Sequence, residues 1–204
     1  IARNNRTAKG ESTYLILSQV RESFGRVVYS HKVHEKQADI CFCKHRWQQG
    51  VLIGLTAIGS VTFLTEVVGL LANRTAASLT TSLVALLVTW VSLGAKTFNY
   101  SEEAEAHRVT ASQLWTVRES YISLITDLMS GDISSTEAQA RRNELQEKTY
   151  SIYSTAPRTS DRAFKRAQEG LKQNEEMTFT PREIDLFLPE ALRFNDDKDQ
   201  DDNF

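Results

Sequence analysis

The sequence predicts an all-α protein: a two-helix transmembrane hairpin extended by long cytoplasmic helical arms, with additional C-terminal helices packing on them. Two apolar stretches, at about residues 50–72 and 77–95, are each long enough to cross a hydrocarbon core, which takes ~20 apolar residues. Only Asn73-Arg74-Thr75-Ala76 separates them, and so short a turn requires two antiparallel neighbouring helices. Apolar residues elsewhere recur at helical spacing, and nothing indicates a β-sheet.

Basic residues near the ends of the two stretches predict their orientation. Residues 44–46 are Lys-His-Arg and Lys96 follows the second stretch, whereas the turn offers only Arg74. By the positive-inside rule, both termini are therefore cytoplasmic and the turn faces outward. The expected segments are, in chain order, an N-terminal cytoplasmic arm (1–46), transmembrane helix 1 (47–72), a short extracytoplasmic turn (73–76), transmembrane helix 2 (77–97), a second cytoplasmic arm (98–130), C-terminal helices (131–194) and an acidic disordered tail (195–204).

The N-terminal arm is expected to be helical from Ser12 onward and frayed before it. No proline interrupts the stretch up to the first span, so one helix can run from the arm into the membrane. Trp47 and Tyr100 lie where interfacial aromatic residues belong. Residues at alternating three- and four-residue spacing form one seam of a heptad pattern: Leu17, Val20, Phe24, Val27, His31, His34, Ala38 and Cys41.

The second arm carries a comparable helical face, and Gly131 is expected to end its helix. Ser134 followed by Glu137 predicts a capping box that opens a helix at about 135–153. The residues expected to face inward are Ala104, His107, Ala111, Leu114, Trp115, Val117, Tyr121, Ile125 and Leu128 in the arm, and Leu145, Ile152 and Tyr153 in the helix after it.

The C-terminal part is expected to hold two more helices. Pro157 ends the preceding helix, and a new one is expected at about 161–173, with Phe164, Ala167 and Leu171 on one face. Thr180-Pro181-Arg182-Glu183 combines a capping residue, a proline at the first helical position and an acidic third residue, so it predicts the start of a short last helix.

Whole-chain composition argues against several classes of protein. The formal net charge is −2, so neither direct nucleic-acid binding nor a uniformly basic membrane-binding face is expected. Cys41 and Cys43 are too few for a disulfide framework, and their i, i+2 spacing disfavours a bridge, so two reduced cytosolic thiols are expected. Residues 1–40 are charged and polar, and we expect no cleavable signal peptide ahead of the hairpin.

Catalytic signatures are missing from the sequence, which lacks a Gly-rich phosphate loop, a G-x-S-x-G, an H-E-x-x-H and a spaced CxxC pair. We therefore expect a protein that is not an enzyme, with no catalytic residue and no cofactor. His31 and His34, at i and i+3, could share a metal ion with Glu35. Polar seam positions that fix helix register explain these histidines better, so no metal site is expected.

Polar residues inside the two spans suggest a path through the membrane. Glu66 is ionisable, and a charge at the bilayer centre costs at least ~2.5 kcal/mol, so it faces either a pore lumen or polar helix interface, or snorkels outward. Small and hydroxyl residues support close packing between helices, and one hairpin offers little surface to use them. Association of several hairpins is therefore expected, with Glu66, Thr62, Ser82, Thr89 and Ser92 as pore or interface candidates.

The chain resembles the SLATT family, the two-transmembrane effector domains found beside bacterial nucleotide-sensing and nucleotide-synthesising defence genes. The likeness lies in the order of elements, in the segment from Ala106-His107-Arg108 to Asp127-Leu128, and in a closing motif, Phe179 to Ile184-Asp185 with Phe187-Leu188-Pro189 and Leu192. That motif is similar to the subgroup associated with reverse transcriptases. The resemblance implies an antiphage membrane effector in the bacterial inner membrane that forms a pore or disrupts the membrane and causes growth arrest or death.

The resemblance also implies a trigger, such as a cyclic nucleotide or a reverse transcriptase or nucleotidyltransferase partner. No nucleotide-binding motif carries over to this sequence, so an anion would be sensed by cytoplasmic basic residues such as Arg108, Arg118, Arg141 and Arg142. Their alternative role is a solvated helix face with i, i+4 ion pairs. Other hypotheses are a non-conducting membrane scaffold or sensor that docks a soluble enzyme, a membrane-anchored enzyme, and a soluble helical bundle.

Overall fold

The computed structural model describes residues 2–60 and 74–193, and every regular element within these ranges is a helix. This confirms the predicted all-α fold class. The chain forms two compact units, residues 1–167 and 168–204.

The first helix, α1, runs without interruption over Ala2–Ile58. The predicted continuity of the arm into the first apolar stretch is therefore present as far as Ile58. The helix begins well before Ser12, the expected start. The remainder of the first stretch, including Thr62 and Glu66, lies outside the described residues.

The second apolar stretch forms α3, Arg74–Thr97. Arg74, Thr75 and Ala76 are thus helical rather than part of the turn, since arginine and alanine are strong helix formers. Among the described residues, the segment Ser82–Ser130 contains an 18-residue window that is long and apolar enough to cross a membrane, and none of that window is buried. Helices α1 and α3 pack together near Gly59, where an added Cβ would lie 3.3 Å from Val84 Cγ1.

Helix α4, Tyr100–Ser130, begins after a short break that the sequence analysis did not predict. Asn99 caps the new helix by accepting a hydrogen bond from the Glu102 N–H at 3.4 Å. Gly131 ends it in the left-handed conformation, with φ +79°, and its N–H bonds to the Asp127 carbonyl. The predicted role of Gly131 as a helix terminator is therefore confirmed.

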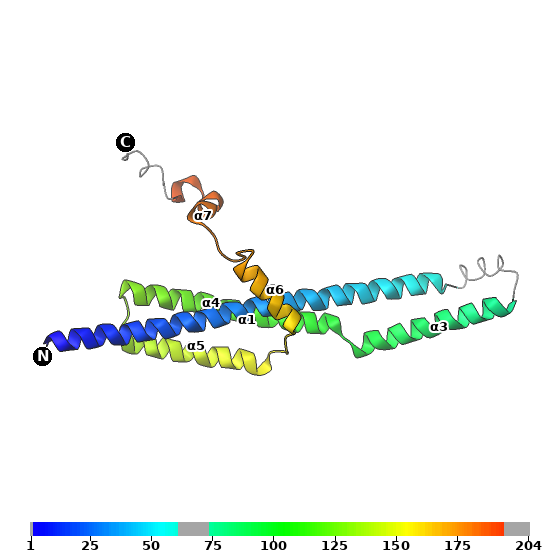
Figure 1. Cartoon of the computed structure of the whole chain (residues 1–204), viewed down its shortest axis with the longest axis horizontal. Helices are drawn as coiled ribbons and strands as arrows, with labels where there is room; N and C mark the ends of the chain where they lie inside the picture. Colours follow the sequence, from blue (N-terminus) through cyan, green and yellow to red (C-terminus); the bar gives the residue numbers. More distant parts are fainter. Residues whose placement is uncertain (1, 61–73, 194–204) are drawn as a thin grey trace. The chain divides into compact units, whose positions relative to one another are not determined.

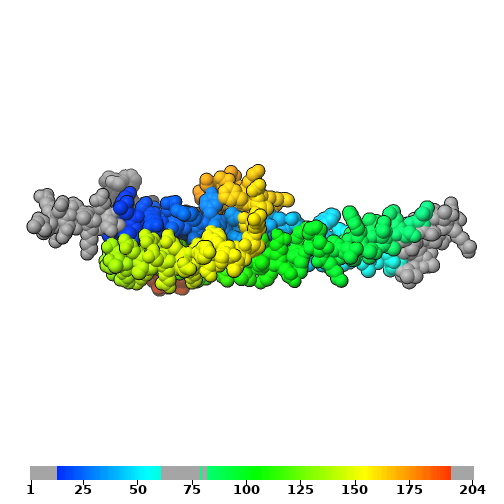
Figure 2. Space-filling view, turned by 90° about the horizontal axis from the view of Figure 1, so that it is seen from below, coloured from blue at the N-terminus to red at the C-terminus, as the bar shows by residue number. Residues whose placement is uncertain are grey.

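Helix α5, Ser135–Thr155, starts at the predicted cap, where Ser134 accepts a hydrogen bond from the Glu137 N–H. Figure 1 shows α1 and α4 side by side and antiparallel, with α5 beside both. Figure 2 shows the face on which α5, in yellow-green, covers them. Their shared apolar core, here called the distal core, consists of Ile16, Val20, Val27, Leu114, Val117, Tyr121, Leu124, Leu128, Ala138 and Ile152.

The remaining elements follow the predicted order. Helix α6 spans Asp161–Lys172, and its first part buries Ala163 and Ala167 against Val33 and Ile40 of α1. In the second unit, α7 spans Pro181–Phe187, and the structure confirms the predicted capping box between Thr180 and Glu183. A short 3₁₀ turn, Glu190–Leu192, follows.

The predicted inward faces are correct at most positions and wrong at two aromatic ones. Trp115 is 49% exposed and Tyr153 41% exposed, although the Tyr153 hydroxyl still hydrogen-bonds Ser30. Each directly follows a core residue, Leu114 or Ile152, and the 100° step of a helix carries it to the edge of the packed face. Bulky aromatic side chains can be half-buried there without leaving polar groups unsatisfied.

Candidate functional site

A layer of buried polar side chains lies between α1 and α4, on the side of the distal core that leads toward the apolar stretches. Its members, here called the polar layer, are His31, His34, Gln37 and Cys41 of α1 and His107 and Thr110 of α4. All six are buried. Buried polar groups are costly unless they find partners, so the contacts within this layer determine its role.

His34 and His107 form the central contact of the layer. Their Nδ1 atoms are 2.9 Å apart, so one ring donates a proton to the other. Burial, the neighbouring charge of His107 and that of His31 lower the pKa of His34 to about 4. Burial also lowers the pKa of His107, against the opposing influence of Glu103. Both rings are therefore neutral at physiological pH, and one Nδ1–H donates a hydrogen bond to the other Nδ1.

His31 lies one turn away on α1 and contacts Glu35, with 3.7 Å between Nε2 and the carboxylate. Burial lowers its pKa, and Glu35 partly opposes that effect. Within the described part of the chain, His31 Nδ1 and His107 Nε2 are the buried side-chain polar atoms that have no hydrogen-bond partner. Each of these nitrogens is a position at which a ligand or ion would relieve a desolvation cost.

Gln37 connects the layer to the start of α6. Both the backbone N–H and the hydroxyl of Ser160 donate to Gln37 Oε1, at 3.1 and 2.6 Å. Because the amide oxygen is thereby fixed toward Ser160, the amide nitrogen faces Cys41 and donates to its Sγ at 3.4 Å. Burial raises the pKa of the Cys41 thiol, whereas Cys43 is exposed. The two cysteines are free and lie in different environments, consistent with their predicted spacing on different faces.

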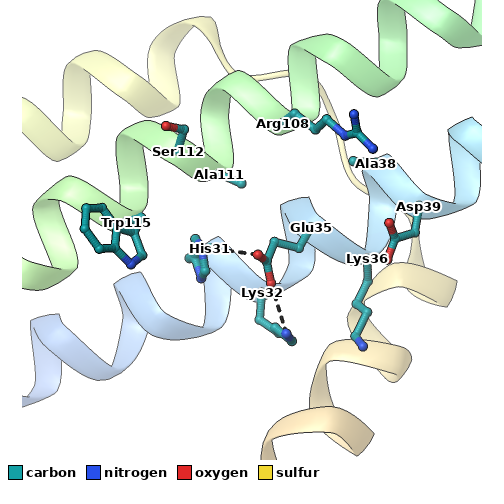
Figure 3. Close-up of a pocket in the computed structure, with 10 residues that line it drawn as sticks. All are labelled: His31, Lys32, Glu35, Lys36, Ala38, Asp39, Arg108, Ala111, Ser112 and Trp115. Atoms are coloured by element: carbon teal, nitrogen blue, oxygen red, sulfur yellow. Dashed lines mark hydrogen bonds and ion pairs between the residues drawn. The ribbon is translucent and has the colours of Figure 1, made fainter. Parts of the chain in front are cut away.

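A pocket of about 430 Å³ opens beside the polar layer, between α1 and α4 (Figure 3). Its lining includes the basic residues Lys32, Lys36 and Arg108 and the acidic residues Glu35 and Asp39. Lys32 forms an ion pair with Glu35, and the Arg108 guanidinium lies 5.5 Å from the centre of the Phe42 ring. His31, Ser112 and the half-exposed Trp115 complete its polar and aromatic surface. The pocket therefore offers cations, a hydroxyl and an aromatic face together.

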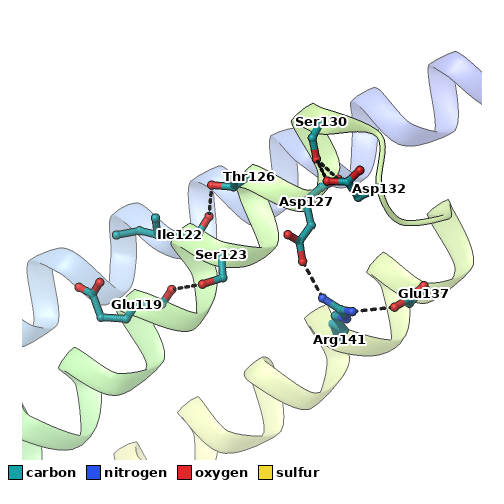
Figure 4. A network of polar contacts seen from close by, with 9 residues as sticks. All are labelled: Glu119, Ile122, Ser123, Thr126, Asp127, Ser130, Asp132, Glu137 and Arg141. Carbon is teal, nitrogen blue, oxygen red and sulfur yellow. Dashed lines mark hydrogen bonds and ion pairs between the residues drawn. The ribbon is translucent and has the colours of Figure 1, made fainter. Parts of the chain in front are cut away.

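The other basic residues proposed as sensors lie elsewhere and have protein partners. Arg118 is half-buried and pairs with Glu119 at 2.6 Å. Arg141 links α5 to α4, because it pairs with Asp127 and with Glu137, each at 2.7 Å (Figure 4). Arg142 donates to Gln19 of α1 at 2.6 Å and to the neighbouring Asn143. Of the four predicted sensor residues, the structure brings Arg108 alone to the pocket beside the polar layer.

The pore candidates that the structure describes all lie on α3. Ser82, Thr89 and Ser92 are exposed in the single chain, and the Thr89 hydroxyl donates to the Ala85 carbonyl at 2.8 Å. Nearby, Trp47 and Trp90 are 76% and 77% exposed, and Lys44 Nζ lies 5.1 Å from the centre of the Tyr100 ring. Exposed tryptophans beside a basic residue at one end of an apolar helix are typical of a membrane interface.

A family model for the SMODS and SLOG-associating 2TM effector domain, family 4, matches residues 16–183. The chain belongs to this SLATT family. The match extends from the distal core of α1 to the start of α7 and includes both the polar layer and α3. No curated protein and no solved structure matches the chain. Membership in a two-transmembrane effector family implies a membrane protein with an effector role in defence systems.

One end of the polar layer of this SLATT protein holds a group of potential metal ligands that was not predicted from the sequence. Ligand atoms of Cys41, Glu103 and His107 lie within 4.8 Å of one another, while His31, His34 and Glu35 form no such group in the described part of the chain. Glu103 and His107 are at i and i+4 on α4, a spacing that places both on one helix face. That spacing was the available signal, but its pairing with Cys41 depends on the register between α1 and α4.

Proposed function

We propose that this SLATT protein is a membrane effector of bacterial antiphage defence. When triggered, several copies assemble in the inner membrane and form a pore or disrupt the bilayer, which arrests growth or kills the cell. The family match across residues 16–183 supports the proposal most strongly, because it covers α3 together with both arms. An effector of this kind needs a surface that lipid or other copies can cover and a cytoplasmic site that receives a signal.

The surface of α3 supports assembly of several copies. Leu83, Leu86 and Trp90 are 57%, 65% and 77% exposed in the single chain, far more apolar surface than a helix facing water usually presents. Ser82 and Thr89 are seven residues apart and so share one face of the helix. In a bilayer, hydroxyl groups favour helix–helix contacts over lipid. Facing one another across several copies, they would form a polar path, to which Thr62 and Glu66 of the first stretch would also contribute.

The pocket beside the polar layer is the proposed trigger site. An anionic nucleotide suits it, since Arg108 and the two lysines supply cations and Trp115 supplies a ring on which a base can stack. Helix α1 runs from this pocket into the first apolar stretch, and α4 follows α3 directly. A ligand that binds better to one packing of α1 against α4 would shift the population of that packing, and so act on both spans.

Membrane potential in bacteria that express the full chain, followed with a voltage-sensitive dye with and without phage, tests the proposal. We expect depolarisation after infection that Glu66→Ala and Thr89→Val change in extent. Thr116→Val is the matched control and should behave as wild type, because Thr116 is an exposed threonine of α4 that bonds a carbonyl of its own helix as Thr89 does. Arg108→Ala should abolish the response to the trigger, whereas Arg162→Ala, an exposed arginine on α6, should leave it intact.

A steady potential under every trigger would contradict the proposal. It would favour the alternative function, a non-conducting membrane scaffold or sensor whose arms dock a soluble partner enzyme. In that case the full chain should co-purify with a partner, and liposomes containing it should not leak.

A further inference from the structure

We propose that Cys41, Glu103 and His107 bind a zinc ion that joins α1 to α4 next to the apolar stretches. No metal site was expected from the sequence, because fixing of helix register explained the histidines of the α1 seam, on which Cys41 also lies. The packing of α4 supplies the other two ligands. The resulting set of one thiolate, one imidazole and one carboxylate is of the kind that zinc accepts.

The geometry of the three side chains suits a zinc ion. Their ligand atoms lie within 4.8 Å of one another. Tetrahedral zinc, with bonds of about 2.0–2.3 Å, holds its ligand atoms about 3.3–3.8 Å apart, so closure takes a movement of about 1.5 Å or less. Glu103 is exposed and can supply that movement, whereas Cys41 and His107 are both fully buried and fixed by the helix packing.

The unpartnered nitrogen of His107 is the second, independent observation. Its Nδ1 is occupied by His34 at 2.9 Å, and its Nε2 is buried without a hydrogen-bond partner. A metal bound at Nε2 would require the proton to reside on Nδ1, from which it would be donated to His34. This is the usual arrangement of a metal-ligating histidine, whose second nitrogen is held by a neighbouring acceptor. His34 is then a positioning residue for His107.

The surroundings of the sulfur point the same way. Gln37 donates its amide N–H to Cys41 Sγ, and Ser160 prevents the amide from turning around. Burial raises the pKa of the Cys41 thiol, and the Gln37 N–H opposes that effect. This donor would therefore support a metal-bound thiolate, as outer contacts commonly support metal ligands. Three protein ligands leave a fourth position for water on the exposed side of Glu103.

A metal at this place would clamp the two arms where they approach the membrane. Glu103 lies in the first turn of α4, directly after the break between α3 and α4, and Cys41 lies on α1 just before Trp47. Zinc would therefore fix the register of α1 against α4 at this end. Its loss would loosen the polar layer without disturbing the distal core.

Cobalt titration of the purified full-length protein in detergent, after removal of metals by a chelator, tests the site. Cobalt replaces zinc in such sites, and a thiolate ligand gives an intense near-ultraviolet charge-transfer band. We expect one cobalt per chain, the thiolate band, and its displacement by zinc. Cys43→Ser, which removes the exposed cysteine two residues away, is the matched control and should keep the band.

Cys41→Ser should lose the band, and Glu103→Gln, a substitution at an exposed position, should keep the band but weaken cobalt binding about tenfold or more. Zinc should also raise the melting temperature of wild type and Cys43→Ser but not of Cys41→Ser. The proposal is overturned if no thiolate band appears in wild type, if the band follows Cys43 instead of Cys41, or if Glu103→Gln binds cobalt as tightly as wild type.

Discussion

The distal core and the polar layer are two regions of the same α1–α4 pair, yet they are built from opposite chemistry. In the distal core, Val20 and Val27 pack against Leu114 and Tyr121, and α5 covers the contact. In the polar layer, histidines, an amide and a thiol occupy equivalent inward positions. The two regions follow one another along a single uninterrupted helix, so the change in chemistry reflects position along the arm and not a change of fold.

The difference indicates that the distal core and the polar layer have different roles in the arms. Apolar contacts are non-directional and grow with buried area, so the distal core supplies stability. Buried hydrogen bonds are directional, and a half-satisfied set is costly, so the polar layer allows few registers between the helices. A region with unsatisfied nitrogens next to the spans is better suited to respond to a ligand or ion than a tightly packed apolar one.

Leu114→Ala should give the largest effect and tests whether the distal core dominates stability. Leu114 is fully buried, and removal of a buried leucine side chain costs about 2–5 kcal/mol. Thermal unfolding of the full chain in detergent, followed by circular dichroism, should show a clearly lower midpoint. Met129→Ala on the same helix, at a side chain that is 69% exposed, should change stability by about 0.5 kcal/mol or less. Equal effects of the two substitutions would contradict the division proposed above.

His34→Leu tests the polar layer. We expect the free energy of unfolding to fall by about 1–3 kcal/mol, less than for Leu114→Ala, because the substitution leaves His107 Nδ1 buried without its partner. The double substitution His34→Leu/His107→Leu removes both groups and should cost less than the sum of the single changes. Unfolding with a chelator present measures the cycle free of metal binding.

Alkylation of buried Cys41 in a Cys43→Ser background gives a local measurement of the same cycle. If the polar layer opens, Cys41 should be alkylated faster in His34→Leu than in the double variant His34→Leu/His107→Leu. If the two single effects simply add, the His34–His107 contact carries no coupling, and the layer does not fix register through this pair.

The pH dependence of the free energy of unfolding also distinguishes the polar layer from the distal core, because the distal core has no histidine. The folded pKa of His31 lies below its ordinary value of 6.5, so the unfolded chain binds protons more readily. Stability is therefore full above pH 6.5 and falls as the pH decreases toward the folded pKa. His31→Gln should reduce this loss in metal-free protein, although Glu35, Lys32 and Arg118 still surround the site. A slope unchanged by His31→Gln would assign the pH dependence to other groups.

Sequence periodicity predicted most of the distal core, including Val20, Val27, Leu114 and Tyr121. It missed three of its buried residues, Ile16, Leu124 and Ala138. Local capping signals were equally informative: Gly131 and Ser134 perform the roles that their residue types suggest. These features depend on residues close in sequence, and their physics is local.

The polar layer could be predicted only in part. His31, His34 and Cys41 were recognised as seam positions, but their partners on α4 depend on the register of two helices joined through the spans. Gln37 was missed because its partner, Ser160, is far along the chain, and α6 covers a second face of α1. The break at Asn99 was missed because one capping side chain is a weak signal without a proline or glycine.

Arg141→Ala should have the smallest effect on stability and separates a structural role from a sensing one. Its ion pair with Asp127 joins α5 to α4, and its pair with Glu137 lies within α5. Arg141 is about half-exposed, and such pairs contribute about 0–1 kcal/mol. The melting temperature should therefore change little, and more at low salt than at high salt. If triggering of membrane depolarisation is also unchanged, Arg141 serves only the distal region. If triggering is lost while the melting temperature is unchanged, the trigger binds at α5 and not in the pocket beside the polar layer. That result would contradict the proposal that the membrane-facing end of the arms responds to the trigger.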